Sequence, residues 1–160
     1  MTAEQWEQAV SLFRQAIQLN ADKSEMFYWT SVDKASSVGT KMAQELAFHY
    51  KTMRNYDKAY LFCKEVLQKN PNDVKWLAAC AETEVCRGKE KDALLTYQKV
   101  LSLDVNHLAA NIFVGNYYYL MAEQEKQQLM RDYKKISSPT RMQYARYKDG
   151  LSKLMTDGYG

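Results

Sequence analysis

The stretch Tyr56-Asp57-Lys58-Ala59 returns in altered form as Glu90-Lys91-Asp92-Ala93, and the offset in residue number is 93 − 59 = 34. The same offset relates Val66-Leu67 to Val100-Leu101. It also carries the small residue Ala47 to Ala81 and then to Gly115. A fixed period of this length, with a small residue at the same place in each copy, is typical of repeated helix–turn–helix units. The period therefore predicts a chain built from stacked helix pairs.

Turn residues divide these units into helices. The run Asn70-Pro71-Asn72-Asp73 ends one helix, because the residue before proline avoids the helical conformation, and its Asn and Asp can cap the next helix. Gly88 stands where a left-handed residue is wanted after a helix. We expect a short extra helix or an ordered crossing at 24–36. The predicted helices cover 3–20, 37–53, 56–69, 74–86, 90–103, 108–121, 124–136 and 140–155.

The repeated residues resemble the tetratricopeptide repeat, a 34-residue helix–turn–helix unit. The best matches read Leu46-Ala47-x-x-Tyr50 and Asn55-Tyr56-Asp57-x-Ala59, and the second unit contributes Gly88, Ala93, Tyr97, Val100 and Leu101. The resemblance implies an all-α fold, a right-handed superhelical array of antiparallel helix pairs, and a bacterial protein. It divides a single domain, 1–160, into a half repeat (3–20), an insertion (24–39), two good repeats (40–73 and 74–107), a degenerate repeat (108–142) and a truncated repeat (143–160).

Both ends of the array depart from the pattern. Ala9 aligns with Ala59 only at an offset of 59 − 9 = 50, or 34 plus 16, which is why an insertion is expected. Gln127 stands where Ala59 and Ala93 stood, in a strongly polar segment. That helix is expected to sit less tightly or to extend from Met121 as one long rod. The final residues, 157–160, resemble an inter-helix turn, so we expect a chain cut within an array or one that has lost its last helix.

Composition argues against several classes of protein. The 160 residues carry a net charge of only +3, and three cysteines, Cys63, Cys80 and Cys86, are expected to be free core thiols in a reducing, cytoplasmic setting. His49 and His107 are far apart, so no metal site or cofactor is expected. The sequence contains no Gly-rich phosphate loop and no nucleophile–base pairing, and we therefore predict that it is not an enzyme.

One uncharged stretch, 105–122, is long enough to raise the question of a membrane span. It contains Asn106, His107, Asn111, Gly115 and Asn116, and it is at the short end for crossing a bilayer. A buried repeat helix explains this stretch better. No membrane span is expected, and pairing of two copies through the open ends of the array is a possible assembly.

The resemblance implies that the first helices line a concave groove that binds a peptide or helix of a partner protein. A subgroup of the family clamps a terminal carboxylate with Lys, Asn and Arg. Gln44, Phe48, Ala78 and Ala79 stand at such positions here, so this clamp is not expected. An apolar and aromatic groove remains. Its expected residues are Gln44, Phe48, Lys51, Lys75, Ala78, Glu82, Ile112, Asn116, Tyr119, Tyr144, Tyr147 and Lys148, with Lys41 beside them.

Exposure provides a test of this groove. We expect Phe48, Tyr119 and Tyr147 to be more exposed than the repeat-core residues Tyr50 and Leu101, because aromatic anchors must be accessible to a partner.

An alternative function rests on the segment 133–153. It interleaves tyrosines with six cations against the single acid Asp149, for a local charge of 6 − 1 = +5. Aromatic platforms beside cations suit single-stranded RNA or another polyanion. A solvated basic helix face is the commoner explanation, so protein binding remains the preferred interpretation.

Overall fold

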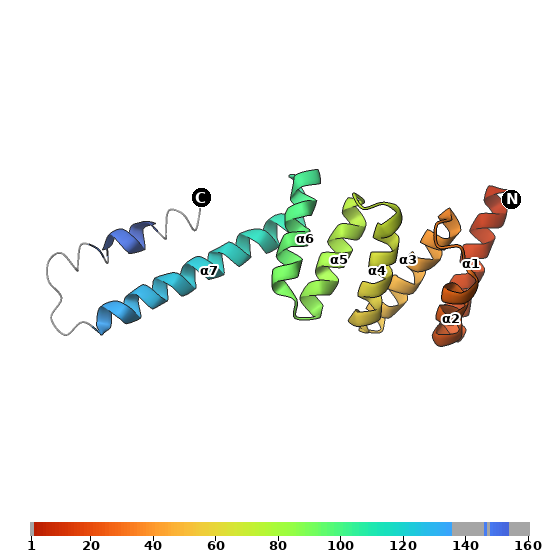
Figure 1. The fold of residues 1–160 in the computed structure, drawn as a ribbon, viewed down its shortest axis with the longest axis horizontal. Coiled ribbons are helices and arrows are strands. Elements are labelled where there is room, and N and C mark those ends of the chain that lie inside the picture. The colour runs from red at the N-terminus through yellow and green to blue at the C-terminus, as the bar shows by residue number, and fades with distance from the viewer. Residues whose placement is uncertain (1, 136–145, 147, 154–160) are drawn as a thin grey trace. The chain divides into compact units, whose positions relative to one another are not determined.

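A computed structural model describes residues 2–135, 146 and 148–153, and these residues form helices without any strand (Figure 1). Packing separates the chain into two compact units, residues 1–110 and 111–160. The helices are α1 (Ala3–Leu19), α2 (Ala21–Ser31), α3 (Ser37–Thr52), α4 (Tyr56–Lys69), α5 (Val74–Cys86), α6 (Glu90–Leu103) and α7 (Leu108–Lys134), and residues 148–153 are also helical.

Local signals set the helix boundaries. Side-chain oxygens cap the first backbone N–H groups of five helices, from Thr2, Asn20, Ser36, Asn55 and Asp73. Gly88 adopts the left-handed conformation with φ of 77°. The helices predicted at 37–53, 56–69, 74–86 and 90–103 are confirmed to within one residue.

Consecutive helices pack against one another in the first unit. The pairs α3 and α4, then α5 and α6, are in close contact, and α4 also packs against α5. Ala47, Ala59, Ala81 and Ala93 are all at most 2% exposed, which places the small residues of the repeat period inside these pairs as predicted. A larger side chain at these positions would push the helix axes apart.

The N-terminal part of the chain requires a correction. The sequence alignment treated 3–20 as a second helix followed by an insertion at 24–39. Instead, α1 packs beside α3, and α2 is a separate helix that contacts both α1 and α3. The starts of α1 and α3 are one period apart (37 − 3 = 34). The division of the chain into repeats otherwise remains a prediction.

In α2, a charged residue occupies the position where the repeat period places a small residue, so the period alone did not identify this helix. Glu25 lies one period before Ala59 (59 − 25 = 34). Its carboxylate accepts hydrogen bonds from Tyr50 Oη and, at 2.9 Å, from Lys58 Nζ, so the charge is partnered where an alanine was expected. Burial by itself raises the pKa of Glu25, but hydrogen bonds from Tyr50, Lys58 and Trp29 together hold that pKa below its usual value.

An aromatic cluster fixes α2 on its neighbours. The Phe62 ring on α4 packs edge-on to Tyr28 at 5.6 Å between centroids and stacks on Tyr50 at 5.9 Å, while Trp29 lies 5.4 Å away. Tyr28 and Phe62 are almost completely buried. Because aromatic side chains bury large areas, this cluster is a major part of the core of the first unit.

The second unit departs from the two-helix prediction. Helices were predicted at 108–121 and 124–136, but α7 runs without a break from Leu108 to Lys134, so that prediction is wrong. The alternative of one long rod is the correct one. Gly115 was expected at a helix crossing, but no described residue places a heavy atom within 4 Å of a Cβ built on it. The described part of the chain therefore forms no close crossing at Gly115.

Other residues of the second unit are placed only in part. Gly150 lies in the short helix, and a Cβ there would come within 3.2 Å of Leu129 on α7. Most of the truncated repeat predicted at 143–160 lies outside the described residues. Within the described part of the chain, no helix combines the length and apolar character needed to cross a membrane.

Candidate functional site

Three contiguous pockets lie along the first helices of the first unit, and together we call them the first-helix furrow. The pocket between α1 and α3 has a volume of about 350 Å³, the central pocket about 480 Å³, and the pocket beside α5 and α6 about 530 Å³. Neighbouring pockets share lining residues. Arg14, Gln44 and Glu45 line the first and the central pocket, and Lys75 and Ala79 line the central and the third.

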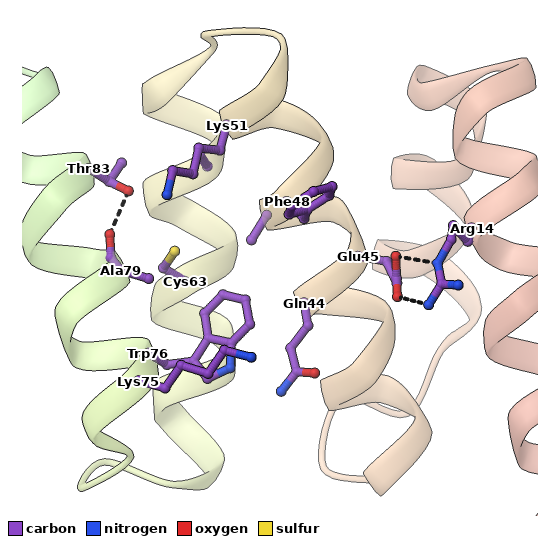
Figure 2. A pocket seen from close by; sticks show the side chains of 12 residues that line it. Arg14, Gln44, Glu45, Phe48, Lys51, Cys63, Lys75, Trp76, Ala79 and Thr83 are labelled. Atoms are coloured by element: carbon purple, nitrogen blue, oxygen red, sulfur yellow. Dashed lines mark hydrogen bonds and ion pairs between the residues drawn. The ribbon is translucent and has the colours of Figure 1, made fainter.

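The central pocket combines a small-residue floor with larger side chains around it (Figure 2). Ala47 on α3, Ala59 on α4 and Ala79 on α5 leave space between the helices because their side chains end at Cβ. The remaining lining residues are Arg14, Gln44, Glu45, Phe48, Lys51, Cys63, Lys75, Trp76 and Thr83. This arrangement presents apolar surface inside a polar rim.

Ion pairs tie the rim together across neighbouring first helices. Arg14 donates two hydrogen bonds to the Glu45 carboxylate, at 2.9 and 2.6 Å, and joins α1 to α3. Lys51 pairs with Glu82 at 3.0 Å and joins α3 to α5. These pairs are substantially exposed, so each contributes little to stability. They do, however, neutralise four of the charges along the furrow.

The floor of the central pocket is uncharged. Burial raises the pKa of the Cys63 thiol to about 11, so it stays protonated at neutral pH. Cys80, which is also buried, has its pKa raised to about 12 mainly by burial. Cys86 is exposed, so the expectation of core thiols is wrong for that residue. A protonated buried thiol packs as a small apolar group rather than acting as a nucleophile.

The structure brings together part of the predicted groove. Gln44, Phe48, Lys51 and Lys75 line the central pocket, and Lys75, Ala78 and Glu82 line the third. The remaining predicted residues belong to the second unit. Of these, Ile112, Asn116 and Tyr119 are exposed on α7, Lys148 is exposed in the short helix, and Tyr144 and Tyr147 lie outside the described residues.

The exposure prediction can be checked for two of its three aromatics. Phe48 is 69% exposed and Tyr119 is 40% exposed, against 5% for Tyr50, while Leu101 is half-buried. The prediction is therefore confirmed at Phe48, and Tyr119 is also more exposed than Tyr50. Tyr147 cannot be compared, because it lies outside the described residues. The basic segment 133–153 falls largely outside them too, and its proposed binding of RNA stays a prediction.

Trp76 is the main lining residue that sequence reasoning missed. It lies one period after Met42 (76 − 42 = 34), a buried core residue, so its register suggested core packing. A signal was nevertheless present three positions later. Ala79 stands in the register of Glu45, and replacing a long side chain by a methyl group leaves space beside Trp76.

Among the described residues, no group of three or more His, Cys, Asp or Glu side chains could hold a metal ion. None of the described residues that line the central pocket is a histidine. The central pocket offers a ligand apolar surface, aromatic rings and a few charged groups. Such a site can hold a side chain by burial and orient it by charge.

Over its described residues the chain is all-helical, and three contiguous pockets lie along α1, α3 and α5. No family model matches the chain, and no curated protein matches it. Among solved structures, it is similar to a chain described as a "putative protein binding protein" from Bacteroides ovatus, with 66% sequence identity and a TM-score of 0.87. The match covers 98% of this chain and 76% of the other. The chain belongs to the same family as that Bacteroides ovatus protein.

Proposed function

We propose that the chain is a protein-interaction scaffold of the tetratricopeptide type, in which the first-helix furrow holds a peptide or helix from a partner protein. In this proposal α1 with α2, α3 with α4, and α5 with α6 are successive repeats of a right-handed superhelical array. The regular helix starts support it, since α3 starts one period after α1, as α6 does after α4.

The continuity of the furrow carries the proposal. A linear segment needs an extended surface, and the three pockets share residues from α1 through α3 to α5. Phe48 offers an exposed aromatic ring at the central pocket, and Trp76 is half-buried beside it. Aromatic residues in partly desolvated sites contribute strongly to protein binding.

The comparison with Bacteroides ovatus adds independent support. That protein is described as a "putative protein binding protein", and the present chain, which is 66% identical to it over 98% of its own residues, is expected to have a related role. The groove itself, and the inclusion of Ile112, Asn116, Tyr119, Tyr144, Tyr147 and Lys148 in it, are part of the proposal. A cytoplasmic location and pairing of two copies remain predictions.

Site-specific photo-crosslinking in the native host tests this function. A photoreactive phenylalanine analogue would replace Phe48 in the furrow, and in a matched control it would replace Leu61, which is exposed on α4 and lines none of the furrow pockets. We expect discrete adducts from position 48 that survive nuclease and disappear with protease, and few from position 61. Adducts destroyed by nuclease, or equal adducts from both positions, would contradict the proposal.

A further inference from the structure

The charge pattern of the furrow identifies the chemistry of its partner. Arg14 is neutralised by Glu45, and Lys51 is neutralised by Glu82. Lys75 lies where the central pocket meets the third, and no described residue forms an ion pair or hydrogen bond with its ammonium group. It is therefore the one charge lining the central pocket that is left without an ion-pair partner in the described part of the chain.

The position of Lys75 matters as much as its charge. Its neighbour along the chain, Trp76, lines the same pocket, and no described residue accepts a hydrogen bond from the Trp76 indole N–H. Below them, Ala79 and Ala47 form part of the apolar lining. A cation and a free N–H donor thus stand beside apolar space, which matches a carboxylate next to a bulky apolar side chain.

The first pocket provides a contrast. Lys41 has the same register as Lys75, since 75 − 41 = 34, and it too has no ion-pair partner among the described residues. Glu7, however, lines that pocket with it, so the two charges offset each other there. Among the described residues, neither the central nor the third pocket has an unpaired acid in its lining. The attraction for an anion is therefore concentrated at Lys75.

We propose that the central pocket receives a bulky apolar side chain of a partner segment, and that Lys75 pairs with an Asp or Glu side chain close to it on the same segment. This inference rests on the proposed function and specifies the partner as an acidic, amphipathic peptide. The volume of about 480 Å³ leaves room for one large side chain beside the Phe48 and Trp76 rings. The carboxylate sets the register of the segment, and the apolar side chain supplies most of the affinity.

Selection from a library of random linear peptides, displayed on phage and presented to the immobilised full chain, tests the inference. The enriched peptides should carry an Asp or Glu within about one helical turn of a Trp, Phe, Leu or Met. One enriched peptide would then be synthesised in two forms, one of them with its acid changed to the matching amide. Affinities of both forms are measured by fluorescence anisotropy.

The variant Lys75→Glu should weaken binding of the acidic peptide by about tenfold or more, and it should affect the amide peptide much less. The matched control Lys89→Glu changes an exposed lysine outside the furrow pockets, and it should leave both affinities unchanged. An equal loss for both peptides, or a selection with no preference for acids, would overturn the proposal while leaving furrow binding intact.

A second variant tests the pocket itself. Ala79→Leu places a larger side chain in the central pocket and should also reduce affinity by about tenfold. The matched control Ala21→Leu enlarges a half-buried alanine at the start of α2 and should have no effect on binding. Thermal unfolding of both variants shows whether they fold. Unchanged binding by a folded Ala79→Leu variant would overturn the pocket assignment. If the phage selection enriched no peptide at all, the proposed function of the furrow as a peptide-binding site would be contradicted as well.

Discussion

The pair α5 and α6 and the single helix α7 share a register, yet they have different structures. Ala81 on α5 and Gly115 on α7 are one period apart, but Ala81 is completely buried, whereas Gly115 is exposed and has no described residue within 4 Å of a Cβ built on it. A small residue permits a close helix crossing. A small residue alone does not produce a crossing, because the chain must also turn after the first helix so that a second helix packs back against it.

The connection between the helices explains this difference. The turns after α3 and α5 each contain a residue with positive φ, Arg54 at 59° and Gly88 at 77°, and these two residues are one period apart. The next position in the register is Ala122, followed by Glu123, and both are good helix formers without turn character. The helix therefore continues, and residues 124–134 extend α7 instead of packing back. The central pocket, by contrast, lies over the paired helices and has Ala59 of α4 in its lining.

Substitution of the buried alanines would sharpen this comparison most strongly. Ala93→Leu, and likewise Ala59→Leu, should lower the free energy of unfolding by about 1–3 kcal/mol, because each position is enclosed by neighbouring helices. Gln127→Leu, at the same register in the exposed face of α7, should change it by about 0.5 kcal/mol or less. Chemical denaturation measures all three. Equal losses would show that α7 has a packed partner at that position.

Two glycines should give effects of opposite sign. Gly88→Ala forces a side chain into the left-handed conformation and should destabilise by about 1 kcal/mol. Gly115→Ala adds a methyl group to open space within a helix and should stabilise α7 by up to about 1 kcal/mol. Thermal unfolding followed by circular dichroism detects both shifts. A destabilising Gly115→Ala would indicate a close neighbour at that glycine and break the comparison.

The acid dependence of stability should reside in the first unit. The pKa of Glu25 is lowered in the folded state, so its carboxylate stabilises the fold at pH values above the ordinary 4.5. That contribution is lost as the pH falls through the lowered folded-state value. Glu25→Gln should cost about 1 kcal/mol at neutral pH and flatten the acid limb of the stability curve.

Glu123→Gln on α7 is the matched control and should leave that curve unchanged. Denaturation between neutral pH and strong acid measures both variants. An unaltered acid limb in Glu25→Gln would remove the role assigned to the bonds from Tyr50 and Lys58.

The sequence predicts the features that recur at the 34-residue period, but it does not predict those that depend on contacts of a single residue. The period at Ala59 and Ala93, with the turn at Asn70-Pro71, was sufficient to place α3 to α6, because these residues act locally. The helix predicted at 3–20 matches α1, but residues 24–39 were wrongly assigned to an insertion. Glu25 occupies a small-residue position in α2, and it is accommodated by hydrogen bonds from Trp29 and from Tyr50 and Lys58, which are distant in the chain.

The candidate site was predicted in the same uneven way. Phe48 and Lys75 were predicted as groove residues from the helix face on which they lie, and both line the central pocket. The place of Trp76 in the pocket could not be predicted in this way. Its register matches the buried Met42, and its exposure depends on the space left by Ala79. Which side chains share a pocket is decided by packing between helices, and a repeat alignment does not contain that information.

Amide hydrogen exchange of the full chain, followed by mass spectrometry, tests the contrast between the packed helices α4 and α5 and the stretch 111–128 of α7 most directly. Amides of α4 and α5, which pack against helices on both sides, should exchange only at rates set by global unfolding. Those in the stretch 111–128 of α7 should exchange orders of magnitude faster, because local opening exposes them. Protection of 111–128 equal to that of α4 would contradict the account, since it would require a packed second helix against α7.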